Sequence, residues 1–223
     1  MTKIRTLDGK NIFLKNKGYI NNPNMDLSSE EEQKSEKEKS GLLTLDRLIY
    51  INGEFDESLA KDVTLKLLDL SIKDKSPIVF MIDSFGGYVY SLLQIVDIME
   101  AIPNKIITII TGKAMSSAAT LAVCGTVGNR YILKNGTLMF HQLRYGSYGT
   151  VDEQKVSLKE AEKLQKYMNK IILQRTKIDP KNYDEFMSQD RYLQPQEALK
   201  LGIVDAVVNP SIMSQITEMI KTK

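Results

Sequence analysis

The chain has 223 residues, and its 30 Lys and Arg nearly balance its 28 Asp and Glu, for a formal net charge of +2. That balance, without a basic face or aromatic residues interleaved with basic ones, does not favour nucleic acid as a partner. Cys124 is the only cysteine, so no intrachain disulfide can form, and its apolar neighbours predict a buried thiol. No segment approaches the roughly 20 apolar residues of a membrane span, and no secretory signal pattern follows Met1, so we expect a cytosolic protein without membrane association.

Residues 1–41 differ in composition from the rest of the chain. Residues 28–40, with the sequence SSEEEQKSEKEKS, contain no apolar side chain. Such a run cannot bury enough surface to offset the entropy lost on ordering, so we predict a mobile, charged segment or a solvated helix. A docking or regulatory arm is the alternative. The folded domain is predicted over residues 42–223.

From residue 42 on, apolar strands alternate with helical patterns. Strands are predicted at residues 47–53, 77–82 and 105–110, and helices at residues 59–70, 88–102 and 116–124. These strands are too apolar to have one face in water. The alternation is typical of βαβ units, and it predicts an α/β fold with a parallel sheet covered on both faces.

Two chemically suggestive turns follow the second and third predicted strands. Ser116 and Ser117 lie where residues 105–110 give way to a helix, whose first N–H groups are unpaired and favour negative charge. Gly86 and Gly87 permit a tight turn with exposed N–H groups. Because the carboxyl ends of parallel strands meet at one edge, we expect both turns to face one crevice. A helix cap and an ordinary glycine turn are the alternatives.

His141 is the only histidine of the chain. It follows the second of two short predicted strands, residues 130–133 and 137–140, which the turn signal Asn135-Gly136 separates. Imidazole is the only side chain whose unperturbed pKa lies near neutrality. If the chemistry needs an imidazole base, His141 is therefore the only candidate. A structural role at the end of a strand is the alternative.

The last third of the chain begins with a long amphipathic helix, predicted over residues 151–177. About 27 helical residues would span about 40 Å, more than the core of this domain requires, so a second copy of the chain is the expected partner of its far end. Asp190 lies in a loop before a helix that begins at Pro195. A short final strand is predicted at Ile203 and Val204.

Four segments, in chain order, resemble motifs of the Clp protease proteolytic subunit family, ClpP. Residues 82–87 (IDSFGG) are similar to its glycine-rich loop, and residues 112–116 (GKAMS) to its nucleophile motif G-x-A-x-S. Residues 138–142 (LMFHQ) are similar to its histidine motif, and residues 190–205 to its closing block, which begins with Asp-Arg. Each motif alone is weak, but the resemblance covers about residues 45–208 and includes the only histidine.

The resemblance implies a ClpP/crotonase-like fold and a serine endopeptidase, a hydrolase of peptide bonds in unfolded proteins. Ser116 would be the nucleophile, His141 the base and Asp190 the acid that orients the imidazole. The backbone N–H groups of Gly87 and Ser117 would form the oxyanion hole.

The resemblance also implies assembly and a partner. Family members are homo-oligomeric tetradecamers of two stacked heptameric rings, joined by the 151–177 helix as a protruding handle. An AAA+ unfoldase of the Clp type feeds them unfolded polypeptide and is the component that uses ATP, so the chain itself would need no cofactor. With one histidine and no cysteine cluster, we expect no metal site either. Asp83 and Phe85 depart from the family's Asn and Pro, and Leu143 stands where Pro is usual.

Two other functions remain open at this point. A crotonase-type acyl-CoA enzyme would use the region of Gly87 and Ser117 as an oxyanion hole, but it would give Ser116, His141 and Asp190 no role. A non-catalytic ring subunit that partners an active copy is the second alternative.

Overall fold

A computed structural model describes residues 2–5, 11–14 and 45–220 of the chain, which divides into two units, Met1–Leu43 and Thr44–Lys223. In the first unit, β1 (Thr2–Arg5) pairs antiparallel with β2 (Asn11–Leu14). Neither strand is predicted from the sequence. The charged stretch at 28–40, on which the prediction of a mobile segment rests, lies outside the described residues.

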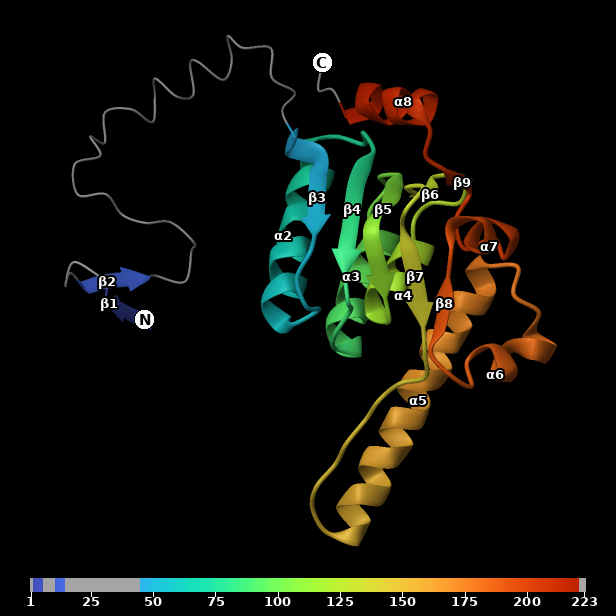
Figure 1. Cartoon of the computed structure of the whole chain (residues 1–223). Helices are drawn as coiled ribbons and strands as arrows, with labels where there is room; N and C mark the ends of the chain where they lie inside the picture. Colours follow the sequence, from blue (N-terminus) through green and yellow to red (C-terminus); the bar gives the residue numbers. More distant parts are fainter. Residues whose placement is uncertain (1, 6–10, 15–44, 221–223) are drawn as a thin grey trace. The chain divides into compact units, whose positions relative to one another are not determined.

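The second unit is built on a seven-stranded, mostly parallel sheet (Figure 1). Its main path runs β3 (Leu48–Ile51), β4 (Ile78–Ser84), β5 (Ile106–Met115), β6 (Arg130–Ile132) and β9 (Ala206–Val207), each parallel to its neighbour. The central strands are apolar on both faces, as the sequence predicts for a parallel sheet. The predicted α/β fold class is confirmed.

The strand β5 is longer than predicted and carries two partners along one edge. β6 pairs with Thr108–Ile110, whereas β7 (Thr137–Phe140) pairs, also in parallel, with Lys113–Met115. The Asn135-Gly136 turn therefore joins two strands that follow one another along β5, not the two arms of a hairpin. β8 (Arg191–Leu193) then pairs antiparallel with β7.

Three helices cover one face of this sheet: α2 (Glu57–Lys73), α3 (Val89–Ala101) and α4 (Ser117–Val123) (Figure 1). Their buried side chains pack with the alternate strand residues Phe80, Ile82 and Ile110 in one continuous core. The Asp56 carboxylate begins α2 by accepting the N–H of Leu59 at 2.7 Å. The predicted βαβ arrangement is therefore present, with helix bounds within a few residues of those expected.

The opposite face is covered differently from the prediction. A helix that the sequence analysis did not predict, α8 (Pro210–Ile220), packs Ile216 against Val79, Ile107 and Ile109. No crossover helix lies on this face among the described residues, and Tyr50 remains 49% exposed there. The prediction that both faces are covered thus holds only in part, because α8 reaches only some of the strand residues on its side.

The predicted long helix is α5 (Val151–Arg175), which projects from the domain (Figure 1). Its 25 residues correspond to about 37 Å. Only Leu164 and Ile172 are buried, while apolar side chains near its start, including Val156, are exposed. It ends two residues earlier than predicted, because the Thr176 hydroxyl bonds to the carbonyl of Ile172 and the extended chain at Thr176 leaves the helix.

The remaining helices are short. η2 (Pro180–Asn182), α6 (Tyr183–Phe186) and α7 (Pro195–Lys200) follow α5, whereas η1 (Leu45–Arg47) precedes β3 and contacts α8. The predicted final strand is displaced: Ile203 and Val204 are buried in a turn, and pairing starts at Ala206. Within the described residues, no helix is long and apolar enough to cross a bilayer.

Candidate active site

Ser116 stands at a sharp junction between β5 and α4. Its φ of 55° and ψ of −121° make it the one residue other than glycine with positive φ in the described part of the chain. Its N–H donates to the carbonyl of Met139 at 2.8 Å, which ties the junction to β7. Such conformations are costly and gather at functional sites, and a strained strand-to-helix turn is a known way to present a nucleophilic serine.

Neither serine hydroxyl caps α4, which was the alternative to a catalytic role. The hydroxyl of Ser116 makes no capping bond to α4, and none of the hydrogen bonds among the described residues uses it. The hydroxyl of Ser117 instead donates to the carbonyl of Gly87 at 2.8 Å. The alternative of a simple cap is therefore wrong for both residues.

The glycine turn touches this junction directly. Gly86 and Gly87 have φ values of 95° and 150°, and a Cβ on Gly86 would come within 2.9 Å of the backbone nitrogen of Ser117. A Cβ on Gly87 would lie 2.5 Å from the nitrogen of Phe55, so both positions require glycine. The two turns therefore lie against each other, but the cavity that Ser116 lines includes neither glycine, so a crevice shared by both turns is not observed among the described residues. Among the described hydrogen bonds, neither the N–H of Gly87 nor that of Ser117 is a donor.

His141 lies beside Ser116 because of the pairing of β7 with β5. Met139 is opposite Met115, so the residue that follows Phe140 emerges at the same edge as the serine. Its Nδ1 lies 2.6 Å from the carbonyl of Gln142. A carbonyl can only accept, so Nδ1 carries the proton and Nε2 of the neutral ring is left with a free electron pair.

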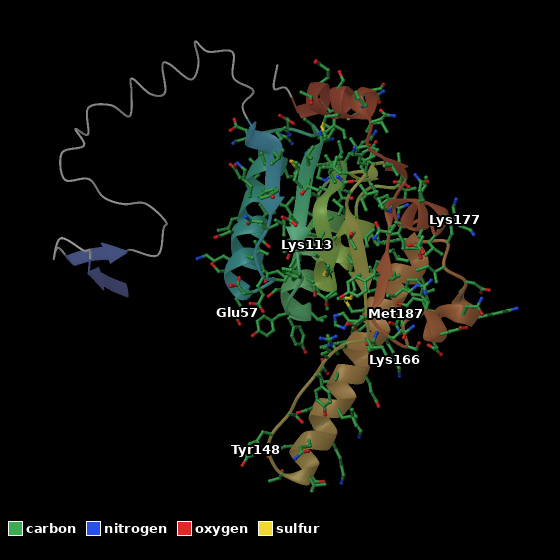
Figure 2. The ribbon with its side chains drawn as sticks, in the orientation of Figure 1. Glu57, Lys113, Tyr148, Lys166, Lys177 and Met187 are labelled. Carbon is green, nitrogen blue, oxygen red and sulfur yellow. The ribbon has the colours of Figure 1, made fainter. Side chains whose placement is uncertain are left out.

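Ser116 and His141 line the same small cavity of about 20 Å³. That volume holds about one water molecule. The other lining residues come from α4, β7 and its following loop, α5 and the segment after α6: Thr120, Phe140, Leu143, Gln165, Met168, Ile172 and Met187. Figure 2 shows Met187 near the base of α5, whereas Tyr148 lies at its projecting end. Most of the lining side chains are apolar.

Asp190 is the one predicted site residue that the structure does not connect to the others. β8 runs antiparallel to β7 with Arg191 opposite Phe140, so the next pair in this register is Asp190 and His141. Side chains at such a position stand about 5 Å apart at their Cβ atoms. The Asp190 carboxylate, however, accepts from Nη2 of Arg144 at 3.0 and 3.1 Å. Among the described residues, no hydrogen bond joins it to His141.

Comparison with known families identifies the chain's relatives. The sequence model of the Clp protease family, described as Clp protease, matches residues 30–211. This match covers more than half of the chain. The chain belongs to the Clp protease family. The resemblance found in the sequence is therefore confirmed, and so is its mixed α/β fold.

Membership supports a Clp-type peptidase, a hydrolase, and relates the chain to proteases that work with Clp-type unfoldases. It does not by itself assign any residue a role. Within the described part of the chain, no group of three or more His, Cys, Asp or Glu side chains could hold a metal ion.

One departure of this Clp protease from the family pattern has a visible structural use. The N–H of Leu143, at the position where Pro is usual, donates to Oε1 of Gln165 on α5. Gln165 then donates to Asn169, which also accepts from the hydroxyl of Tyr183. A proline could not begin this chain of hydrogen bonds because it lacks the N–H. The network ties the loop after His141 to the base of the long helix.

Sequence reasoning missed the side chains that surround the predicted residues. Arg144 carries no motif, and only the folded loop brings it to Asp190. Gln165 and Met168 lie on α5, whose pattern indicates a helix but not a cavity wall. Cys124 was correctly predicted as a core thiol: burial raises its pKa to about 12, so it stays protonated and unreactive at neutral pH.

Proposed function

We propose that this Clp protease is a serine endopeptidase in which Ser116 is the nucleophile, His141 the general base and Asp190 the orienting acid. The observation that carries the proposal is the junction at Ser116: its strained backbone presents a free hydroxyl in the cavity that His141 also lines. The two residues come from different strands, and the pairing of β5 with β7 makes them neighbours.

The hydrogen bond at Nδ1 of His141 favours the tautomer that a base requires. Because its Nδ1 proton is donated to a backbone carbonyl, Nε2 is free to take the proton of Ser116. Attack of the serine oxygen on a peptide carbonyl then forms a tetrahedral intermediate. The imidazolium returns its proton to the leaving amine, and water releases the acyl group from Ser116 by the same steps.

The glycine turn would stabilise the intermediate. The N–H groups of Gly87 and Ser117 have no acceptor among the described hydrogen bonds, and the serine hydroxyl at 117 ties the two segments together through the Gly87 carbonyl. Donors already fixed in place lower the energy of the developing oxyanion, and loss of one costs on the order of 100-fold in rate.

In this proposal, Asp190 reaches the imidazole of His141 only after one rearrangement. Asp190 must exchange Arg144 for the imidazole, which it faces in the β7–β8 register. His141 would exchange the Gln142 carbonyl for the carboxylate on the same nitrogen, so its tautomer is retained. The exchange needs rotation of exposed side chains and of the loop after His141, with no change in strand pairing.

The proposed working form is a homo-oligomer of two stacked heptameric rings in the cytoplasm, which receives unfolded polypeptide from an AAA+ Clp-type unfoldase. Two features support assembly: α5 projects from the domain with exposed apolar residues such as Val151 and Val156, and the neighbouring Tyr148 is fully exposed. A surface of this kind favours burial against another copy. ATP would be used by the unfoldase alone.

The test is covalent labelling of the assembled protein with a fluorophosphonate, followed by peptide mapping by mass spectrometry. We expect one adduct, on Ser116, which is absent in Ser116→Ala and in His141→Ala. Ser117→Ala is the matched control and should still be labelled. An adduct on Ser117 in the wild type would contradict the assignment.

One observation favours a second candidate, a non-catalytic ring subunit: the Asp190 carboxylate is bound to Arg144 rather than to His141. If the fully assembled protein gave no adduct on Ser116, that candidate would be preferred. Thioester or CoA turnover that survives Ser116→Ala would instead indicate the crotonase-type enzyme.

A further inference from the structure

Lys113, labelled in Figure 2, lies on β5 three residues before Ser116. It contacts both residues that flank Ser84 at the start of the glycine turn. Its ammonium donates to Oδ1 of Asp83 at 2.8 Å and lies 4.5 Å from the centre of the Phe85 ring. We propose that Lys113 is a positioning residue: it fixes the segment from Asp83 to Phe85 and thereby sets the place of the Gly87 N–H relative to Ser116. This inference rests on the proposed peptidase function.

Several contacts converge on the Asp83 carboxylate. The backbone N–H of Lys113 donates to the same oxygen as its ammonium, at 3.2 Å. A Cβ at Gly112 would lie 2.7 Å from this oxygen, so the carboxylate lies directly against the backbone of β5. The hydrogen bond from Lys113 lowers the pKa of Asp83, although partial burial opposes the shift. Asp83 is therefore ionised at neutral pH, as a charge-assisted bond requires.

Phe85 connects this pair to the turn. Its side chain is 70% exposed, and within the described residues its only ring interaction is with the Lys113 ammonium. Without that cation nothing polar or aromatic holds the ring in place. The next residue, Gly86, is bound on its other side, where its carbonyl accepts from the N–H of Phe55 and its N–H donates to the Ser84 hydroxyl. Besides the bond from the Ser117 hydroxyl to the Gly87 carbonyl, the turn is thus held at Gly86 and, through Lys113, at Asp83 and Phe85.

The pattern of departures agrees with this role. Asp83 and Phe85 are the two positions at which the glycine loop differs from the family's motif, and Lys113 contacts both. The Asp83 carboxylate and the Phe85 ring are the partners of the Lys113 cation, so the three side chains form one unit. Because an oxyanion donor acts only at about 3 Å, a small displacement of the turn lowers the rate without weakening substrate binding.

The experiment compares Lys113→Met, Asp83→Asn, the double variant and Lys113→Arg as full-length assembled proteins. Lys105→Met is the matched control, since Lys105 directly precedes the same strand at its other end and is exposed. Three quantities are measured: hydrogen exchange of the peptide covering residues 84–88, kcat and KM for a fluorogenic peptide, and the inhibition constant of a peptide boronate, which mimics the tetrahedral intermediate.

We expect Lys113→Met to lower kcat by about fivefold to tenfold and to leave KM within about twofold, the size of effect for two partly exposed contacts acting on one donor. The boronate should bind more weakly by the same factor as kcat/KM, because both depend on the oxyanion. Hydrogen exchange of the peptide covering residues 84–88 should be faster in Lys113→Met than in the wild type. The double variant should be no worse than Lys113→Met, and Lys113→Arg should recover most of the loss.

Unchanged exchange at residues 84–88 in Lys113→Met would overturn the anchoring role, whatever the activity. A rise in KM with constant kcat would overturn the positioning role and assign Lys113 to substrate binding. If the wild type gave no hydrolysis and no boronate binding, the proposed function itself would fail, and faster exchange would then support only anchoring of the turn.

Discussion

Ser116 and Asp190 lie at opposite ends of the proposed triad, and the fold holds them in different ways. Ser116 is fixed by backbone bonds between parallel strands and faces a buried helix and a glycine turn that contact it directly. Asp190 lies before a three-residue strand, and its carboxylate is held by an arginine whose side chain is 74% exposed. The nucleophile and the oxyanion donors are therefore prepared by the core, whereas the acid depends on surface contacts.

This difference teaches where regulation can enter. Strained backbone at Ser116 persists because the surrounding sheet over-determines it. The Arg144–Asp190 pair is exposed and contributes little to stability, so new contacts made on assembly can replace it. In the loop that carries Arg144, the hydrogen bond from the N–H of Leu143 to Gln165 couples the residues after His141 to the projecting helix α5. Movement of that helix would therefore reach the loop that carries Arg144, the partner of the acid.

Among substitutions that keep the nucleophile, the largest effect on activity should come from Asp190, the loosely held acid. Asp190→Asn keeps the shape of the side chain but cannot stabilise the imidazolium, and we expect kcat to fall by about 10,000-fold, as in other serine triads. The check is steady-state hydrolysis of a fluorogenic peptide by the assembled variant, with Asp184→Asn on the neighbouring helix as control. Wild-type activity in Asp190→Asn would remove this residue from the triad.

The core should lose most stability at the Arg130–Asp205 pair. Arg130 is 4% exposed and donates to both carboxylate oxygens, at 3.0 and 2.7 Å. Asp205→Ala leaves a buried cation unpaired, so we expect a loss of about 3 kcal/mol in the free energy of unfolding. Chemical denaturation measures it, with Asp97→Ala on the exposed side of α3 as control. A change below that of the control would contradict this assignment.

The Arg130–Asp205 pair should also make the stability of the protein depend on pH, in a direction that the pKa of Asp205 fixes. Burial opposes ionisation of Asp205, but hydrogen bonds from Arg130 and Gly128 outweigh it and lower the pKa. A lowered pKa in the folded state contributes stability that is fully present above the unfolded value of about 3.9 and is lost as the pH falls through the folded value. The stability difference between wild type and Asp205→Asn should therefore shrink only below about pH 4. A difference that disappears near neutral pH would assign the stabilisation to another group.

A substitution that relieves the backbone strain at Ser116 should raise stability, although it abolishes activity. Ser116→Gly removes the hydroxyl and relaxes a φ of 55°, so we expect about 1 kcal/mol of added stability together with loss of hydrolysis. Thermal unfolding of Ser116→Gly and Ser116→Ala measures it, because alanine removes the hydroxyl but keeps the strain. Equal stability of the two variants would show that the junction is not strained.

The smallest effect should be the change in hydrolysis rate with salt, which acts on the exposed Arg144–Asp190 pair. Added salt screens the Arg144–Asp190 attraction, since the Debye length falls from about 10 Å at 0.1 M to about 3 Å at 1 M. Wild-type hydrolysis per assembled particle should rise about twofold over this range, and Arg144→Met should show no such rise. An identical salt response in both proteins would mean that the arginine does not compete for the acid.

The elements that local pattern determines could be predicted from the sequence. Apolar runs such as Ile78–Ile82 and the alternation with helices indicated the parallel sheet, and the serine and glycine turns were placed at strand ends. The pairing of β7 and β8 could not be predicted, because strands of three or four residues carry too few side chains to specify a partner. The helix α8 was missed although its start signals are present: Asn209 precedes Pro210, and its side chain accepts from the N–H of Ile212 at 2.9 Å.

The side-chain partners of the site were beyond prediction for a different reason. Arg144 and Lys113 contact carboxylates 46 and 30 positions away in the chain, and only the three-dimensional arrangement brings them together. A charged side chain at either position would look like an ordinary surface residue in the sequence. The motifs identified the chemistry at Ser116 and His141, but not which groups hold the glycine turn and the acid.

The most direct test of this contrast is the rate at which a fluorophosphonate labels Ser116 in four assembled proteins: wild type, Arg144→Met, Asp190→Asn and the double variant. If Arg144 holds the acid away from His141, Arg144→Met should label about threefold faster than wild type, a change of the size expected for an exposed ion pair. Asp190→Asn and the double variant should label equally slowly, since the arginine acts only through the acid. A double variant that is still accelerated by loss of Arg144, or an Asp190→Asn protein labelled as fast as wild type, would contradict the account.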